Sequence, residues 1–167
     1  FSLLPGIPLP VGVPITLQTL AVILTGMVLG PGRGTAAVGL YLVAGLAGLP
    51  VFSGFRSGIG VLAGPSAGYL LAFPLAALVV GLLARALMSR IRRARFAVLF
   101  AAGLLTSFSV VHPLGIAGMM LNAKLSFPAA VAADMAFWPG DVVKNLLAAA
   151  VAVSVFAAFP RMVPGTR

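Results

Sequence analysis

Long apolar runs, separated by short gaps rich in proline, glycine or arginine, set the pattern of this chain. The runs cover residues 15–30, 35–49, 66–84, 96–120 and 142–159. A helix needs about 20 apolar residues to cross the hydrocarbon core of a bilayer, and the first two runs are short by that measure. Polar Thr and Gln side chains in the first run indicate that it packs inside a bundle. The pattern predicts five spanning helices in a single transmembrane domain, residues 1–167.

The gaps differ in character. Residues 1–14 hold four prolines and are predicted to form an extended loop. Residues 50–65 are apolar and rich in glycine, which is too irregular for a span and suits a lid over an apolar ligand. Residues 85–95 hold five arginines, and residues 121–138 are predicted to be a loop with a short interfacial helix.

Composition supports a membrane protein. Hydrophobic residues make up 61% of the chain and charged residues 8%, and the mean hydropathy is +1.17. A soluble domain has roughly a quarter charged residues, so this chain is predicted to be an all-α protein that crosses the lipid bilayer several times. The net charge of +9 does not indicate nucleic-acid binding, because the basic residues are confined to the gaps between apolar runs.

Other chemistry is limited by what the sequence lacks. Without cysteine, and with one histidine and two acidic residues, the chain is not expected to build a metal site. It also has no Gly-x-x-x-x-Gly-Lys-Ser/Thr motif, so any ATP hydrolysis that drives it must reside in another chain.

The basic residues predict the orientation in the membrane. Alternating spans place Arg33, the 85–95 loop and the C-terminal tail on one side, with eight of the eleven basic residues. The positive-inside rule makes that side cytoplasmic. The 50–65 loop and the start of the last run then share the outer side.

Asp141 and Lys144 form the most informative pair in the sequence. They lie three residues apart at the start of the last run, on one face of a predicted helix that begins near Pro139 and Gly140. Ionisable groups in a spanning segment are costly and usually mark a functional site. The alternative is that Asp141 caps the helix while Lys144 extends to the membrane interface.

Five stretches together resemble one family. They are Ile15–Leu20, Gly39–Leu42, Gly45–Phe52, Gly64–Leu70 and Pro139–Lys144. In this order and spacing the sequence resembles the BioY family, the biotin-binding S components of energy-coupling-factor (ECF) vitamin transporters. The resemblance implies a bundle of six transmembrane helices, of which this chain shows five; the family's first helix is expected ahead of Phe1.

The resemblance also implies how a ligand is held. Biotin carries a ureido group with two N–H donors, an apolar bicycle and a carboxylate. Asp141 then accepts the ureido N–H groups and Lys144 pairs with the ligand carboxylate or keeps Asp141 ionised. The remaining implied contacts are Phe52, Tyr69 and Trp138 as walls, Gln18 as a polar contact, and Ser53, Gly54 and Arg56 from the 50–65 loop. No catalytic residue and no cofactor are implied.

The family implies partners and a location. These are a transmembrane coupling subunit, two ATP-binding subunits and the bacterial cytoplasmic membrane, with the ligand site facing outward. Three alternatives remain open: an S component for another vitamin, a purely structural bundle, and a membrane-integral enzyme that uses His112 with Asp134 or Asp141. Taken alone, His112 beside Pro113 is interpreted as a packed residue at a kink and Asp134 as a loop residue.

Overall fold

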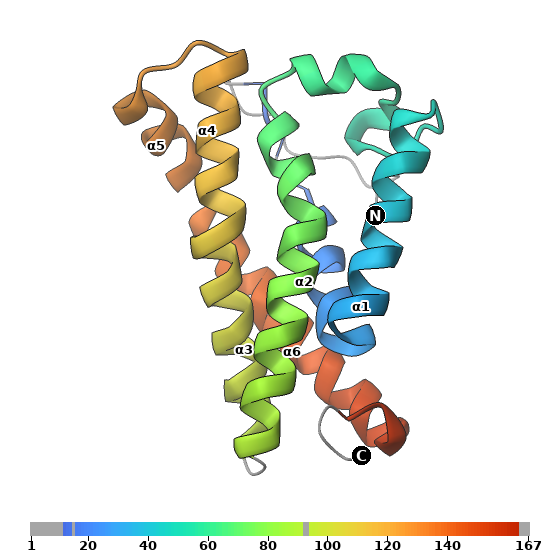
Figure 1. Cartoon of the computed structure of the whole chain (residues 1–167). Coiled ribbons are helices and arrows are strands. Elements are labelled where there is room, and N and C mark those ends of the chain that lie inside the picture. The colour runs from blue at the N-terminus through green and yellow to red at the C-terminus, as the bar shows by residue number, and fades with distance from the viewer. Residues whose placement is uncertain (1–11, 15, 92–93, 164–167) are drawn as a thin grey trace.

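The computed structural model describes residues 12–14, 16–91 and 94–163 of the chain. The long helical segments of the bundle are α1 (Gln18–Leu46), α2 (Ala67–Arg90), the segment formed by α3 (Arg95–Thr106) and α4 (His112–Asn122), and α6 (Trp138–Ala158). By length and composition all four are apolar enough to cross a membrane, although α1 reverses direction at Gly30 and is not one straight span (Figure 1). Within the described residues the structure is helical, without a β-strand, so the predicted all-α membrane fold is confirmed.

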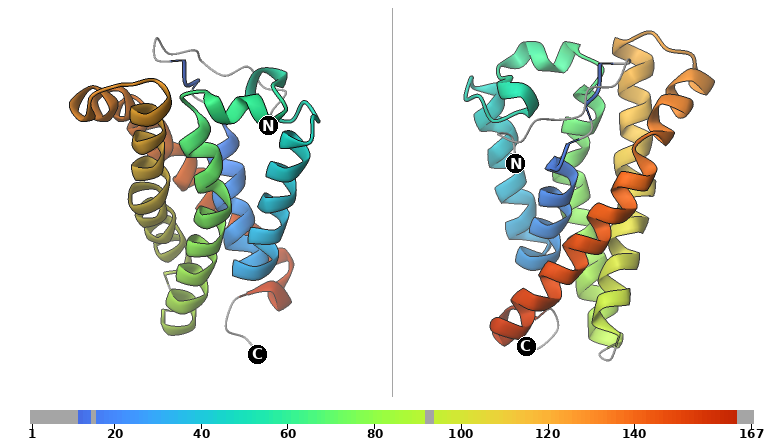
Figure 2. Two further views of the ribbon diagram at one scale, coloured as in Figure 1. Left: turned by 45° about the horizontal axis from the view of Figure 1, so that its top comes forward. Right: turned by 180° about the vertical axis from the view of Figure 1, so that it is seen from behind.

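Helix α1 is a hairpin of two antiparallel limbs. Gly30 adopts φ 77° and ψ 178°, outside the helical region, and Pro31 follows it. Glycine tolerates this positive φ because it has no Cβ, and proline suits the first turn of the second limb. Gly34 of the second limb packs on Gly26 of the first, and the limbs run in opposite directions (Figure 2). The hairpin therefore covers the two short runs expected at 15–30 and 35–49.

A π-helical turn joins α3 to α4. This turn, Ser107–Val111, keeps the segment from Arg95 to Asn122 continuous although Pro113 lies inside it. Proline has no N–H for the helix ladder and its ring crowds the carbonyl one turn earlier, so a widened turn ahead of it relieves the conflict. The consequence is that His112, directly after the wide turn, lies on the buried side of the segment at 3% exposure.

The segments that connect the long helices are more helical than the sequence predicted. Helix α2 continues to Arg90 and α3 begins at Arg95, so most of the predicted 85–95 loop is helical and the connection is short. The predicted short helix in residues 121–138 is α5 (Phe127–Met135). Two 3-10 turns, η1 (Ser53–Phe55) and η2 (Ile59–Ala63), shape the 50–65 loop, and a third, η4 (Pro160–Met162), follows α6. The extended loop predicted for residues 1–14 lies mostly outside the described residues.

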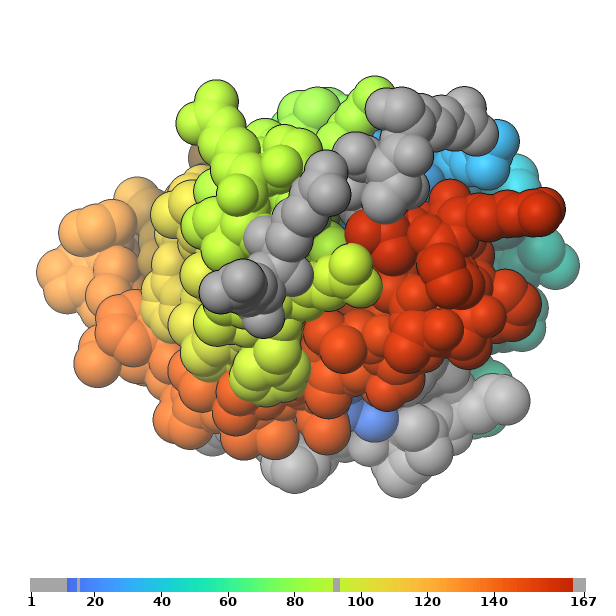
Figure 3. Space-filling model, turned by 90° about the horizontal axis from the view of Figure 1, so that it is seen from below, coloured from blue at the N-terminus to red at the C-terminus, as the bar shows by residue number. Residues whose placement is uncertain are grey.

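The two ends of the molecule carry different structures. The 50–65 loop and α5 lie at one end, drawn at the top of Figure 1, and the α1 turn and the C-terminal part lie at the other. Seen from below, the ends of α2 and α6 both reach this second face (Figure 3). The apolar core is divided in the same way. One buried cluster, with Phe52, Tyr69 and Phe73, lies toward the loop, and a second, with Met27, Leu99 and Phe156, lies toward the other end.

Candidate ligand-binding site

A pocket opens between the 50–65 loop and the upper parts of α1, α2 and α6. It encloses about 540 Å³, counted with its open mouth. Seven of the nine residues predicted to contact a ligand line it: Gln18, Phe52, Ser53, Arg56, Tyr69, Asp141 and Lys144. Segments far apart in the sequence therefore meet at one cavity.

Two of the nine predicted contacts are not in the lining. Gly54 lies in η1 with φ 69° and serves the turn. Trp138 is not part of the lining; its indole N–H donates to Asp134 Oδ2 over 2.8 Å and its ring packs edge-on against Phe108. The neighbouring Phe137, which the sequence did not single out, takes the place in the wall. At the start of a helix, one position decides which of two adjacent aromatics faces inward.

The pocket wall is largely apolar. The further lining residues are Val13, Pro14, Thr16, Thr19, Val61, Ser66, Leu70, Phe73 and Phe137. Phe52 is only 1% exposed, and its ring lies against the bare backbone of Gly45 in α1, where a Cβ would collide with it. Tyr41 meets the same ring edge-on, with 5.7 Å between the centroids. These contacts fix the first part of the 50–65 loop over the second limb of α1.

Asp141 and Lys144 form a buried ion pair at the edge of the pocket. Lys144 Nζ donates to Asp141 Oδ1 over 2.8 Å, and Thr19 Oγ1 donates to the same oxygen over 3.1 Å. The two residues are 4% and 7% exposed. Asp141 lies in the first turn of α6, where the unpaired backbone N–H groups favour a negative charge.

The alternative roles, Asp141 as a helix cap and Lys144 as a residue that extends to the membrane interface, do not fit this geometry. The N-cap of α6 is Phe137, and no side chain makes a capping hydrogen bond there, so Asp141 is not a cap. Lys144 is buried and bonded to Asp141 instead of extending to a membrane interface. A buried pair leaves a costly unpaired charge when one partner is removed, so the two groups depend on each other.

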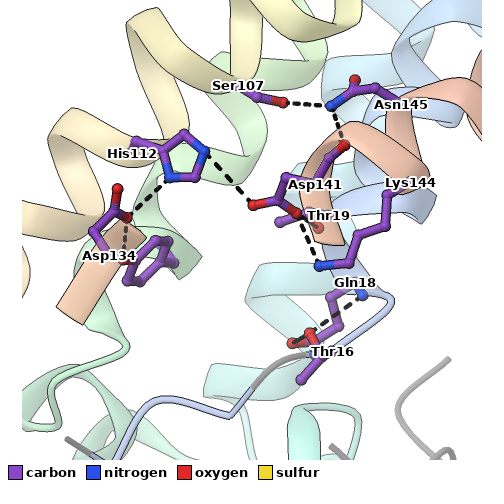
Figure 4. A network of polar contacts seen from close by, with 10 residues as sticks. Thr16, Gln18, Thr19, Ser107, His112, Asp134, Asp141, Lys144 and Asn145 are labelled. Carbon is purple, nitrogen blue, oxygen red and sulfur yellow. Dashed lines mark hydrogen bonds and ion pairs between the residues drawn. The ribbon is translucent and has the colours of Figure 1, made fainter. Parts of the chain in front are cut away.

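The prediction that Asp134 is a loop residue was wrong, because it lies in helix α5, whereas His112 is a packed residue as expected but has polar partners that the sequence did not predict. Asp134 is fully buried at the end of α5, and its carboxylate accepts hydrogen bonds from Tyr69 Oη at 2.6 Å and from Trp138. His112 Nδ1 lies 2.9 Å from Asp134 Oδ1, and its Nε2 lies 3.6 Å from Asp141 Oδ2 (Figure 4). The chain's two acidic groups and its one histidine therefore form one network that ends at Lys144.

Further polar side chains make hydrogen bonds near the pocket, and Asn145 joins the network itself. Asn145 donates to Ser107 Oγ over 3.0 Å and to the Asp141 carbonyl over 2.8 Å, which ties α6 to the π-helical turn (Figure 4). Gln18 donates to Tyr41 Oη over 2.6 Å, and Tyr41 donates to the Val51 carbonyl over 3.1 Å. Arg56 is exposed at the mouth and its Nε donates to the Ser53 carbonyl. Among the described residues, no cluster suited to a metal ion is present.

Comparison with known proteins matches this sequence to one family and to named relatives. The profile of the BioY family matches residues 1–161. The biotin transporter BioY of Rhodobacter capsulatus is 41% identical over 90% of this chain and 83% of that protein. The biotin transporter BioY of Rhizobium etli is 37% identical over 95% of this chain and 87% of that protein.

A solved structure shares the fold. The crystal structure at 2.1 Å of the S component for biotin from an ECF-type ABC transporter superposes with a TM-score of 0.84. The two chains are 30% identical, and the alignment covers 91% of this chain and 80% of that one.

Proposed function

The chain belongs to the BioY family, and from this membership and the pocket we propose that it binds biotin and takes part in its uptake across a membrane as the substrate-specific component of an ECF transporter. The observation that carries the proposal is the buried Asp141–Lys144 pair in the wall of a largely apolar pocket beneath the 50–65 loop. Biotin needs both surroundings, because its ureido and carboxylate groups require polar partners when its bicycle is taken out of water.

The pocket offers each part of biotin a partner. Asp141 is an acceptor for N–H groups, and Lys144 and Arg56 are cations at the wall and at the mouth. The aromatic rings of Phe52, Tyr69 and Phe137 provide faces for the apolar bicycle. We propose these residues as the ligand contacts, with Gln18 and Ser53 as additional polar contacts.

The proposal also covers the partner subunits and the membrane in which the protein lies. ATP hydrolysis would be supplied by two ATP-binding subunits through a transmembrane coupling subunit, because this sequence contains no P-loop motif. We place the protein in the bacterial cytoplasmic membrane with the 50–65 loop outward. The excess of arginines at the opposite end of the bundle supports this orientation.

An enzymatic function is not supported. His112, Asp134 and Asp141 do converge, as such an enzyme would require. However, the family consists of transporter components, and His112 does not line the pocket. The same comparisons favour biotin over another vitamin, because the matched relatives are named as biotin transporters.

Binding to the purified full-length protein in lipid nanodiscs tests the proposal. We expect saturable biotin binding with Kd below about 1 μM, or −8 kcal/mol, and no displacement by excess thiamine or riboflavin. Asp141→Asn and Lys144→Ala should each weaken binding at least tenfold. Lys124→Ala is the matched control, because Lys124 is exposed and outside the pocket. Absence of saturable binding, or displacement by another vitamin, would contradict the proposal.

A further inference from the structure

His112 occupies a position that the ligand contacts do not explain. Its side chain is buried, does not line the pocket, and lies between the only two carboxylates of acidic side chains in the chain. Asp134 lies on one side at 2.9 Å and Asp141 on the other at 3.6 Å. Three elements meet here: the histidine comes from the start of α4, Asp134 from α5 and Asp141 from α6 (Figure 4).

Hydrogen-bond chemistry fixes one side of the imidazole. A carboxylate only accepts, so Nδ1 must carry the proton that it shares with Asp134. Asp134 also accepts from Tyr69 and Trp138, so with His112 three side chains fix the orientation of its carboxyl group. The tautomer and the ring orientation of His112 are thereby set from the side away from Asp141, as in other carboxylate–histidine arrangements.

The other side of the imidazole is aimed at Asp141. Nε2 has no hydrogen-bond partner among the described residues, and Asp141 Oδ2 lies 3.6 Å from it. A lone pair on Nε2 would face the carboxylate unfavourably, whereas a proton there gives a charge-assisted contact.

The two oxygens of Asp141 are held in different ways. Oδ1 receives Lys144 and Thr19, both of which line the pocket. Oδ2 faces His112 from behind the wall. We propose that His112, anchored by Asp134, is a positioning residue that fixes the orientation of the Asp141 carboxylate and so sets the affinity of the pocket. This inference rests on the proposed function for its effect on ligand affinity but not for the contact itself.

The contact can be measured without ligand, because the chain has a single histidine. In protein labelled with ¹⁵N-histidine, we expect both ring nitrogens to resonate as protonated. Asp141→Asn should move the Nε2 resonance and leave Nδ1 nearly unchanged, and Lys124→Ala should move neither. An unprotonated Nε2 whose resonance is the same in Asp141→Asn would overturn the proposal, whether or not biotin binds.

The effect on affinity is tested with His112→Asn. The asparagine amide can replace Nδ1 toward Asp134, but nothing replaces Nε2 toward Asp141. We expect biotin affinity to fall about five- to twentyfold, and less than twofold when the same change is made in Asp141→Asn. The packing control is Phe108→Leu, since the Phe108 ring lies 4.7 Å from the imidazole without a polar role; it should change affinity less than twofold.

The outcomes separate the two proposals. Loss of affinity of the same size in both backgrounds, or unchanged affinity in His112→Asn, would show that His112 does not act through Asp141. Failure of the wild-type protein to bind biotin would contradict the proposed function, and the histidine resonances would then decide the positioning role. If His112→Asn does not fold, the resonances in Asp141→Asn decide it in the same way.

Discussion

Gln18 and Tyr41 are joined by a hydrogen bond of 2.6 Å although 23 residues separate them within α1. In a straight helix that separation would span about 35 Å. The bond is possible because the chain reverses at Gly30, so the first and last turns of α1 lie together at the pocket end. The reversal thus places Gln18 in the pocket wall and lets Tyr41 connect it to the 50–65 loop.

Because the chain reverses at Gly30, we expect alanine substitutions at Gly30 and at Gly32 to differ in their effect on stability. Gly30→Ala should destabilise the protein by about 1–2 kcal/mol, because an L-residue is strained at positive φ. Gly32→Ala is the control: Gly32 is helical and a Cβ there meets nothing within 4 Å. Thermal unfolding in detergent measures both. An equal loss in the two variants would show that the backbone conformation at residue 30 is not the cause.

The contact between α2 and α4 predicts a second pair of glycine variants. A Cβ on Gly68 would collide with the Leu114 carbonyl and come within 2.9 Å of Gly118 Cα. Because both obstacles are backbone, Gly68→Ala should push the helices apart, lowering the melting temperature and weakening biotin binding through the adjacent Tyr69. Gly39→Ala is the control, since its Cβ enters open space in a helix. Calorimetry and ligand titration should show no loss for Gly39→Ala.

The position of Arg56 leads us to expect that its contribution to binding affinity depends on the charge of the ligand. The side chain is exposed at the pocket mouth, so its attraction to a carboxylate is modest and screened by salt. Arg56→Ala should weaken biotin binding about two- to fivefold at low salt, less at high salt, and not affect a biotin amide. Lys124→Ala, also exposed, should have no effect. An equal loss for biotin and its amide would place Arg56 outside carboxylate recognition.

The proposed orientation can be tested because residues 1–167 contain no cysteine. Gly60→Cys lies in the 50–65 loop and Ser89→Cys near the end of α2, and both positions are exposed. In intact cells a membrane-impermeant maleimide should label Gly60→Cys, and should label Ser89→Cys only after the membrane is opened. The reverse pattern would invert the proposed topology.

The fold class and seven of the pocket residues were predicted from the sequence. The contact between His112 and Asp134 at the centre of the polar network was not. Apolar runs and the Pro31 break are local features, and a helix bundle follows from them. The partners His112 and Asp134 lie 22 residues apart, and Asp134 follows a stretch that looks like a solvent-exposed loop. Only the packing of α5 against α4 shows that it is buried.

A signal for Asp134 was present in the composition. In a chain with two acidic residues, each is costly in an apolar bundle, and this scarcity applied to Asp134 as much as to Asp141. The choice between Phe137 and Trp138 as a wall residue had no such signal. It depends on the angle at which α6 starts, which the local sequence does not determine.

Trp138 gives the protein a built-in optical probe. It is the only tryptophan in the chain, its indole is bonded to the carboxylate that anchors the imidazole, and the imidazole centroid is 6.3 Å from its own. Any rearrangement on the far side of the pocket wall changes the polarity around one fluorophore. Emission from the unmodified protein can therefore follow, in real time, whether filling the cavity disturbs the groups behind it.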